Sequence, residues 1–221
     1  MTSPHRLLPC LSLIVFLTGC GVNTHALREQ GARDLETRDY AAAVETYSQL
    51  HELLPEDYDA NFGLGQALLA QNEPLRARTY LQVAYDQAWP RKPLTYEVGG
   101  YLAEAMGRSG DLSAMYAFLR DRAQSSGEER DYLRWGDMAQ KFNDPDQAEL
   151  AYRTAARITR GESVEPYLRL VNFYEALGDK ESAYTRLRQA YGIRQNDPRV
   201  QEKITEFASA EGEITALPAD E

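Results

Sequence analysis

The feature that most constrains this chain is a five-fold internal repeat with a period of about 34 residues. A small or apolar residue that shortly follows a turn-forming segment recurs at spacings of 34, 38, 33 and 35 residues. The five positions are Ala43, Ala77, Met115, Ala148 and Ala183. The longer spacing contains an insertion around residues 89–93, where two prolines predict a non-helical connection. A unit of this length cannot bury its own apolar face, so we expect successive units to stack into one continuous core.

Each unit pairs a small residue in its first helical segment with a large residue in its second. The small residues are Gly31, Gly65, Ala103 and Gly136, and Val171 departs from the pattern. The large residues are Tyr47, Leu81, Leu119, Tyr152 and Leu187. Four units add Leu50, Ala84, Ala155 and Ala190 on the same helix face, three residues further on. Because Gly costs about 1 kcal/mol in a helix interior, the three glycines predict close contact between helices.

The segments between helices carry signals for ending one helix and starting the next. In Gly110-Asp111 and Gly178-Asp179, the glycine suits a left-handed helix end and the aspartate suits an N-cap. Asp144-Pro145-Asp146-Gln147 has the pattern of a capping box. No alternating β-type segment of convincing length occurs, so the sequence predicts an all-α fold.

These marks resemble the tetratricopeptide repeat family over about residues 24–198. The resemblance implies a right-handed α-solenoid of about five helix-turn-helix repeats. Residues 199–208 have an amphipathic pattern that predicts a capping helix, so the solenoid with its cap is expected to span residues 26–208. Residues 209–221 contain four acids, no base and one proline, which predicts an acidic disordered tail.

The N-terminus is predicted to be a lipoprotein signal peptide, residues 1–19. Arg6 precedes an apolar stretch from Leu7 to Leu17, which as a helix reaches about 16 Å and is too short for the ~30 Å hydrocarbon core. Leu17-Thr18-Gly19-Cys20 resembles the lipobox of bacterial lipoproteins, which implies lipidation of Cys20 and a short tether at residues 20–25. The alternative is an unlipidated secretory peptide with a chance cysteine. Within the lipoprotein family, Gly21 after the cysteine favours the outer membrane, facing the periplasm.

Composition argues against several classes of function. A net charge of −10 leaves no excess of cations for a nucleic-acid backbone, and cleavage after residue 19 would remove one Arg and make it −11. Three His and two Cys show no metal-ligand spacing, and no nucleophile elbow or phosphate-binding loop occurs. Gly63-Leu64-Gly65 is better explained by helix packing than by dinucleotide binding, and residues 143–146 by a helix cap than by calcium binding. We therefore expect no enzyme activity, cofactor, metal or small-molecule substrate.

The repeat resemblance implies a groove lined by the first helices that binds an extended peptide or a partner helix. The positions that it carries over are Arg28, Phe62, Gln66, Leu133, Arg134, Asp137, Leu168 and Asn172. Phe62, Leu133 and Leu168 share one register and would form an apolar strip, or they could instead pack between neighbouring first helices. Phe62 is expected to be the most exposed of the three. The Lys and Asn positions of a carboxylate clamp are not matched.

The favoured hypothesis is a lipid-anchored scaffold of the cell envelope that binds another protein and no nucleic acid. The architecture is similar to lipoproteins of pilus, secretion and outer-membrane assembly. One alternative is a regulatory subunit of a cell-wall-modifying enzyme. Another is such an enzyme itself, for which the candidate carboxylates in the groove are Glu104, Asp137 and Glu175.

Overall fold

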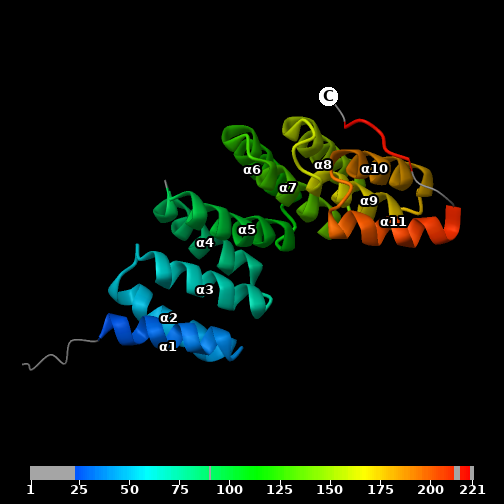
Figure 1. The fold of residues 1–221 in the computed structure, drawn as a ribbon. Helices are drawn as coiled ribbons and strands as arrows, with labels where there is room; N and C mark the ends of the chain where they lie inside the picture. Colours follow the sequence, from blue (N-terminus) through cyan, green and yellow to red (C-terminus); the bar gives the residue numbers. More distant parts are fainter. Residues whose placement is uncertain (1–22, 90, 212–214, 220–221) are drawn as a thin grey trace, which may run out of the picture.

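The computed structural model describes residues 23–89, 91–211 and 215–219, and within these ranges the regular structure is entirely helical. The helices α1 to α10 form five antiparallel pairs, and α11 follows the last pair (Figure 1). Their bounds are α1 Thr24–Glu36, α2 Tyr40–Leu53, α3 Tyr58–Ala70, α4 Pro74–Ala88, α5 Lys92–Arg108, α6 Leu112–Ser126, α7 Glu129–Lys141, α8 Pro145–Thr159, α9 Glu165–Ala176, α10 Lys180–Ile193 and α11 Pro198–Glu211. This arrangement confirms the predicted all-α solenoid of five helix pairs with a capping helix.

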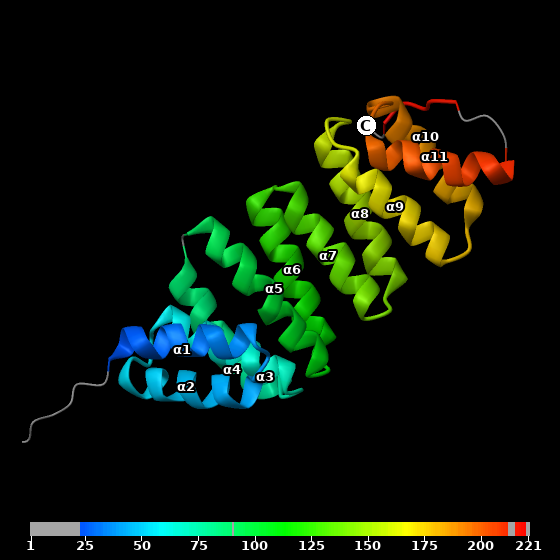
Figure 2. The same ribbon diagram turned by 60° about the horizontal axis from the view of Figure 1, so that its bottom comes forward.

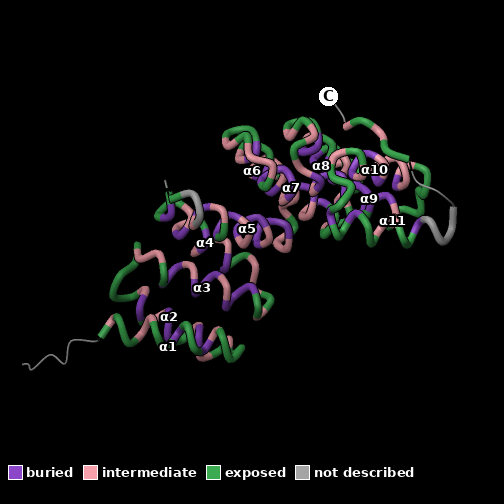
Figure 3. Tube along the Cα trace, in the orientation of Figure 1, coloured by how far each residue is buried: buried purple, intermediate pink, exposed green. Residues whose placement is uncertain are grey.

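The pairs follow one another along a single stack, with the first and last helices at opposite ends (Figure 2). Each helix packs on the next one in the sequence, and α1, α3, α5, α7 and α9 also contact one another in series. These five first helices therefore form one continuous surface, which we call the first-helix face. Buried residues run along the whole stack between the two layers of helices (Figure 3).

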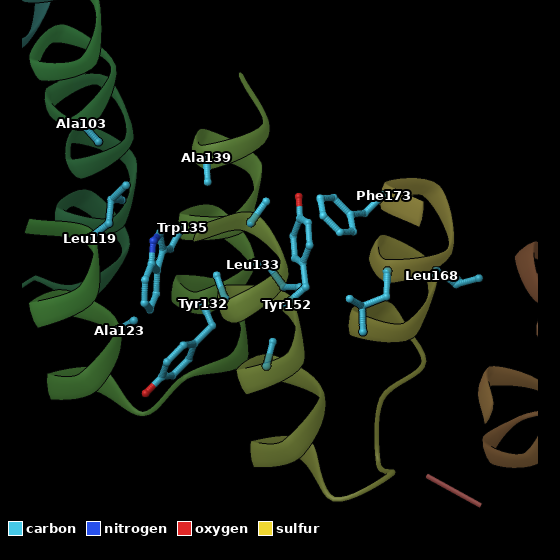
Figure 4. Packing of buried hydrophobic residues seen from close by; sticks show 14 of the residues in the cluster. Ala103, Leu119, Ala123, Tyr132, Leu133, Trp135, Ala139, Tyr152, Leu168 and Phe173 are labelled. Carbon is cyan, nitrogen blue, oxygen red and sulfur yellow. The ribbon is translucent and has the colours of Figure 1, made fainter. Parts of the chain in front are cut away.

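The paired small and large residues lie where the repeat pattern predicts. The five large residues of the second helices are at most 5% exposed, and Leu50, Ala84, Ala155 and Ala190 are fully buried. Each large residue lies 16 positions after its small partner. A Cβ built on Gly31 would lie 2.6 Å from Cζ of Tyr47, and one on Gly136 would lie 2.5 Å from Cδ1 of Tyr152. The glycines are therefore needed because an aromatic ring packs directly on the helix backbone. Figure 4 shows Tyr152 within this core, beside Phe173.

The turn inside each pair has the same backbone conformation in all five repeats. A residue with positive φ is followed by one whose N–H donates to the carbonyl five residues earlier, at 2.8–3.0 Å. The positive-φ residues are Arg38, Asn72, Gly110, Asn143 and Gly178. The sequence identified only the two glycines. This hydrogen bond holds the other three in the same conformation, and the side chain of the next residue also caps the following helix after Arg38 and Asn143.

Three details of the predicted boundaries and caps need correction. Helix α1 begins at Thr24, two residues before the predicted start. The Asp144 side chain accepts from the Gln147 backbone N–H at 3.1 Å, but Oε1 of Gln147 is buried without a hydrogen-bond partner, so the reciprocal half of the capping box is not formed. The predicted disordered tail is wrong for residues 209–211, which continue α11, and for residues 215–219, which lie on α10.

The predicted signal peptide and Cys20 lie outside the described residues. Within the ranges that the structure describes, no helix is long and apolar enough to cross a bilayer.

Candidate protein-interaction surface

The structure divides the eight predicted groove residues among three places on the first-helix face. Arg28, Phe62 and Gln66 line a pocket of about 320 Å³ between α1 and α3. Leu168 and Asn172 line a pocket of about 270 Å³ between α9 and α11. Leu133, Arg134 and Asp137 lie on α7 between these two ends. The first-helix face thus has two separate pockets, with the α7 residues between them, rather than one uninterrupted groove.

The hollow at the N-terminal end continues into a second pocket of about 340 Å³, and Gln66 lines both. We call these two pockets together the N-terminal groove. Its walls come from α1, α3 and α5, with Tyr40 and Tyr47 contributed by α2. The lining residues are Arg28, Glu29, Ala32, Leu35, Tyr40, Tyr47, Asp59, Phe62, Gly63, Gln66, Leu69, Ala70, Tyr101, Glu104 and Arg108. Aromatic and aliphatic surface therefore alternates with both signs of charge and one amide.

Phe62 is the central aromatic residue of the N-terminal groove. Its ring lies between those of Tyr58 and Tyr101, with centroid distances of 5.4 Å to each. The backbone beside it is kept close to the helix behind, because a Cβ on Gly63 would lie 2.6 Å from Cδ2 of Tyr47. Burial raises the pKa of Tyr47 to about 12, so its hydroxyl stays neutral in the wall of the groove.

Phe62 is also the most exposed residue of the predicted apolar strip, which confirms that expectation. It is half-buried, whereas Leu133 and Leu168 are only 9% and 7% exposed. The expectation of an open apolar strip is therefore wrong for Leu133 and Leu168. Both side chains belong to the buried hydrophobic core, as in the alternative in which they pack within the fold rather than line an open groove.

Arg28 is held by two carboxylates of the next repeat. Its guanidinium lies 2.6 Å from Oδ2 of Asp57 and 3.1 Å from Oδ2 of Asp59. The hydrogen bond that Arg28 donates to Asp57 is the largest of the effects that raise the pKa of Arg28. Arg28 thus ties α1 to the start of α3, at the rim of the N-terminal groove.

The middle of the face is closed by two residues that were predicted to line it. The Arg134 guanidinium carbon lies 3.4 Å from the centre of the Tyr96 ring, and Nη1 donates to the Tyr96 carbonyl. Burial lowers the pKa of Arg134. Asp137 accepts from the Tyr152 hydroxyl at 2.7 Å and pairs with Arg169 at 2.9 Å. Both side chains are thus used in contacts between repeats.

Gly100 explains why the apolar register is interrupted in the third repeat. It occupies the α5 position that corresponds to Phe62 and Leu133. A Cβ there would lie 3.1 Å from the guanidinium carbon of Arg134, so the missing side chain leaves the space that Arg134 fills. Tyr101 was not among the predicted groove residues. It shares its repeat register with Arg134, and this register was the signal that could have identified it.

The three carboxylates considered for catalysis are all engaged in ion pairs. Glu104 pairs with Arg108 and with Lys141, Asp137 with Arg169, and Glu175 with Lys203 at 2.8 Å. The Glu104–Lys141 and Asp137–Arg169 pairs link successive first helices, and the Glu175–Lys203 pair links α9 to α11. Across the described part of the chain, no group of three or more His, Cys, Asp or Glu is arranged to hold a metal ion.

Comparisons with known proteins agree with this architecture. Residues 29–93 match the family model of the tetratricopeptide repeat, which confirms the resemblance for the first repeats. The described fold as a whole is that of a tetratricopeptide repeat solenoid. A search of curated proteins gave no significant match.

Several solved structures share the fold at low sequence identity. PilW, described as a widely conserved type IV pilus biogenesis factor, is 16% identical with a TM-score of 0.55, over 82% of each chain. MamA is 18% identical with a TM-score of 0.54, over 88% of this chain and 98% of that one. YrrB, described as a TPR protein with an unusual peptide-binding site, is 12% identical with a TM-score of 0.50, over 82% and 91%. At these identities the similarity shows the fold alone.

Proposed function

We propose that this protein is a lipid-anchored scaffold of the bacterial cell envelope that recruits another protein through its N-terminal groove. The observation that carries the proposal is the groove itself, two adjoining pockets on α1, α3 and α5 that share Gln66, with Phe62 in the first of them. The rest of the first-helix face is largely occupied by contacts between repeats. On the first-helix face, the open aromatic surface is thus concentrated in the N-terminal groove.

The chemistry of the groove suits an extended peptide. Phe62, Tyr101 and Leu35 offer apolar surface for one or two side chains, and the Gln66 amide can both donate to and accept from a peptide backbone. Glu104 and Arg108 lie at the far end, 3.2 Å apart, and can each exchange this pairing for a contact with a charged peptide residue. The peptide-binding description of YrrB, which has the same fold, supports this class of ligand.

The lipid anchor rests on the sequence around Cys20, which resembles a lipobox. The mature chain would carry a charge of −11 after loss of the single leader Arg, so acyl chains rather than a basic patch would hold it at an anionic membrane. Helix α1 begins only four residues after Cys20, which would place the N-terminal groove near the lipid surface. Gly21 favours the outer membrane, with the solenoid in the periplasm.

The anchor is tested by replacing Cys20 with Ser. We expect the Cys20→Ser chain to lose palmitate label, to keep its leader and to fractionate away from the outer membrane, whereas a Cys10→Ser chain behaves as wild type. Equal labelling of the Cys20→Ser chain would contradict lipidation.

The groove is tested by selecting binding peptides from a displayed random library with the lipid-free chain, residues 21–221. Phe62→Ala and Gln66→Ala should each weaken a selected peptide about tenfold or more, which corresponds to ~1.4 kcal/mol. Leu75→Ala is the matched control, because Leu75 is 69% exposed on α4, away from the first-helix face. If the affinity of the selected peptides falls in the Leu75→Ala chain and not in the Phe62→Ala chain, the binding site lies elsewhere. A regulator of a cell-wall enzyme would use the same groove, and its partner would then be that enzyme.

A further inference from the structure

The C-terminal segment 215–219 lies in an extended conformation along α10, on the opposite side of the stack from α11 (Figure 1). The Leu217 N–H donates to the Arg188 carbonyl at 3.0 Å, a contact made to the backbone of a helix interior. The Arg188 side chain donates to the Thr215 carbonyl and hydroxyl, both at 2.6 Å. Backbone and side chain of one arginine therefore both hold the segment.

A glycine on α10 makes this approach possible. A Cβ on Gly192 would overlap the Leu217 carbonyl oxygen and lie 3.2 Å from its carbon. The clash would be with backbone, which cannot move aside by changing a rotamer. Gly192 is otherwise a poor choice near the end of a helix, since Ala in its place would favour helix by roughly 0.5–1 kcal/mol.

The end of the segment reaches the turn between α8 and α9. Ala219 packs against the hydrophobic core, and its Cβ would lie 3.0 Å from a Cβ on Gly161. Gly161 has φ +77°, so it suits this turn for its backbone conformation as well as for its lack of a side chain. Gly161, Arg188 and Gly192 together form what we call the α10 strap site.

We propose that the α10 strap site is a second peptide-binding site, and that residues 215–219 are its built-in occupant. Its ligand is an extended acidic segment of a partner protein that carries the chemistry of the tail. Such a segment offers a carbonyl and a hydroxyl that accept from the Arg188 side chain, and a backbone N–H that donates to the Arg188 carbonyl. It also places a small residue beside Gly161. The acidic flanks follow from the tail, which contains Glu211, Glu213, Asp220 and Glu221 and is bound through a cation. A partner segment binds by displacing the tail, so the tail sets a threshold for binding at this site.

The site differs from a simple brace in what its variants do. Leu217→Pro removes the N–H that donates to the Arg188 carbonyl. The substitution therefore releases the chain's own tail and leaves the site on α10 intact. Gly192→Ala blocks the site for the tail and for any added peptide alike. Release of the tail alone should lower stability in both variants, whereas only the Leu217→Pro chain, with its α10 surface intact, should gain the capacity to bind a separately added segment.

The experiment uses the lipid-free full chain and a fluorescent peptide of residues 212–221, with binding followed by anisotropy. We expect the peptide to bind the Leu217→Pro chain about tenfold more tightly than wild type, and the Leu217→Pro/Gly192→Ala chain about tenfold more weakly than the Leu217→Pro chain. Arg188→Ala in the Leu217→Pro background should also weaken binding, whereas Arg120→Ala, an exposed arginine of α6, should not.

Hydrogen exchange of the Leu217 amide supplies an independent readout in the chain with its own tail. The amide should exchange slowly in wild type and rapidly in the Gly192→Ala chain. Equal peptide affinity of the Leu217→Pro chains with and without Gly192→Ala would overturn the proposal, as would failure of the peptide to bind the Leu217→Pro chain. Neither outcome bears on the N-terminal groove, which lies at the other end of the stack.

Discussion

Replacing Gly136 with Ala tests the packing rule of this solenoid. Gly136 lies in the interior of α7, and a Cβ there would come within 2.5 Å of Cδ1 of the Tyr152 ring. Tyr152 is fully buried, and its hydroxyl lies 2.7 Å from both Asp137 and Gln140, so the ring is fixed at both ends. Overpacking of this kind costs about 1–3 kcal/mol.

The expected magnitude is the balance of two opposite effects. Gly to Ala in a helix interior gains about 1 kcal/mol, which leaves a net loss of up to about 2 kcal/mol for Gly136→Ala. For a chain of this size, each kcal/mol changes the melting temperature by about 2–4 °C, so we expect a decrease of up to about 8 °C. Helix propensity alone would predict the opposite sign. Circular dichroism melts of the lipid-free chain measure the difference directly.

The other repeats supply the compensating change. The third repeat combines Ala103 with Leu119 where the fourth combines Gly136 with Tyr152. Gly136→Ala and Tyr152→Leu should therefore cost less together than the sum of the two single variants, with a coupling of about 0.5–3 kcal/mol. Ala103→Gly, the control, should lose about 1 kcal/mol, with no clash to relieve. A Gly136→Ala chain more stable than wild type, or strictly additive effects in the double variant, would refute the packing argument.

Three further predictions concern other parts of the fold. Leu168→Ser should destabilise the fold by about 2–5 kcal/mol in thermal melts because Leu168 is buried. Phe62→Ser should cost clearly less because Phe62 is half-buried. Equal losses would contradict the assignment of Leu168 to the core. Arg38→Gly should stabilise by up to about 1 kcal/mol, since Arg38 has φ +61° and Gly adopts that conformation without strain, and an unchanged or lower melting temperature would refute this. Burial raises the pKa of Tyr47 and of Tyr58 to about 12, so the folded state favours their neutral forms. The contribution of these neutral forms to the free energy of unfolding is complete below the ordinary tyrosine pKa of about 10. Stability should fall as the pH rises from there toward 12. Melts combined with tyrosinate absorbance would show the loss, and a stability independent of pH over that range would contradict it.

The sequence predicted the elements that depend on local and repeating patterns. The constant spacing between a small residue and its large partner identified helix pairs and their contacts, as Gly31 with Tyr47 shows. The left-handed conformation inside the turns was predicted only at Gly110 and Gly178, and residues 143–146 were predicted as a helix cap. Arg38 carries no such signal, because the hydrogen bond that holds its conformation forms with the preceding helix already folded.

The details of the interaction surface depended on contacts between repeats that a linear pattern does not contain. Leu133 has the register of a groove residue, yet its side chain is buried in the hydrophobic core. Arg134 occupies the space beside Gly100. This contact cannot be predicted without the side-by-side arrangement of α5 and α7. The tail was predicted to be disordered from its composition, but its position on α10 depends on one arginine and one glycine far away in the sequence.

Photo-crosslinking from Gln66 in cells of the source organism tests the central claim most directly. Gln66 lines both pockets of the N-terminal groove, so a photoreactive residue at this position should give one discrete adduct that disappears in a Phe62→Ser chain. The same residue at Thr79, which is exposed on α4, should give no such adduct. An adduct from position 79 with none from position 66, or a position 66 adduct unaffected by Phe62→Ser, would contradict recruitment through the N-terminal groove.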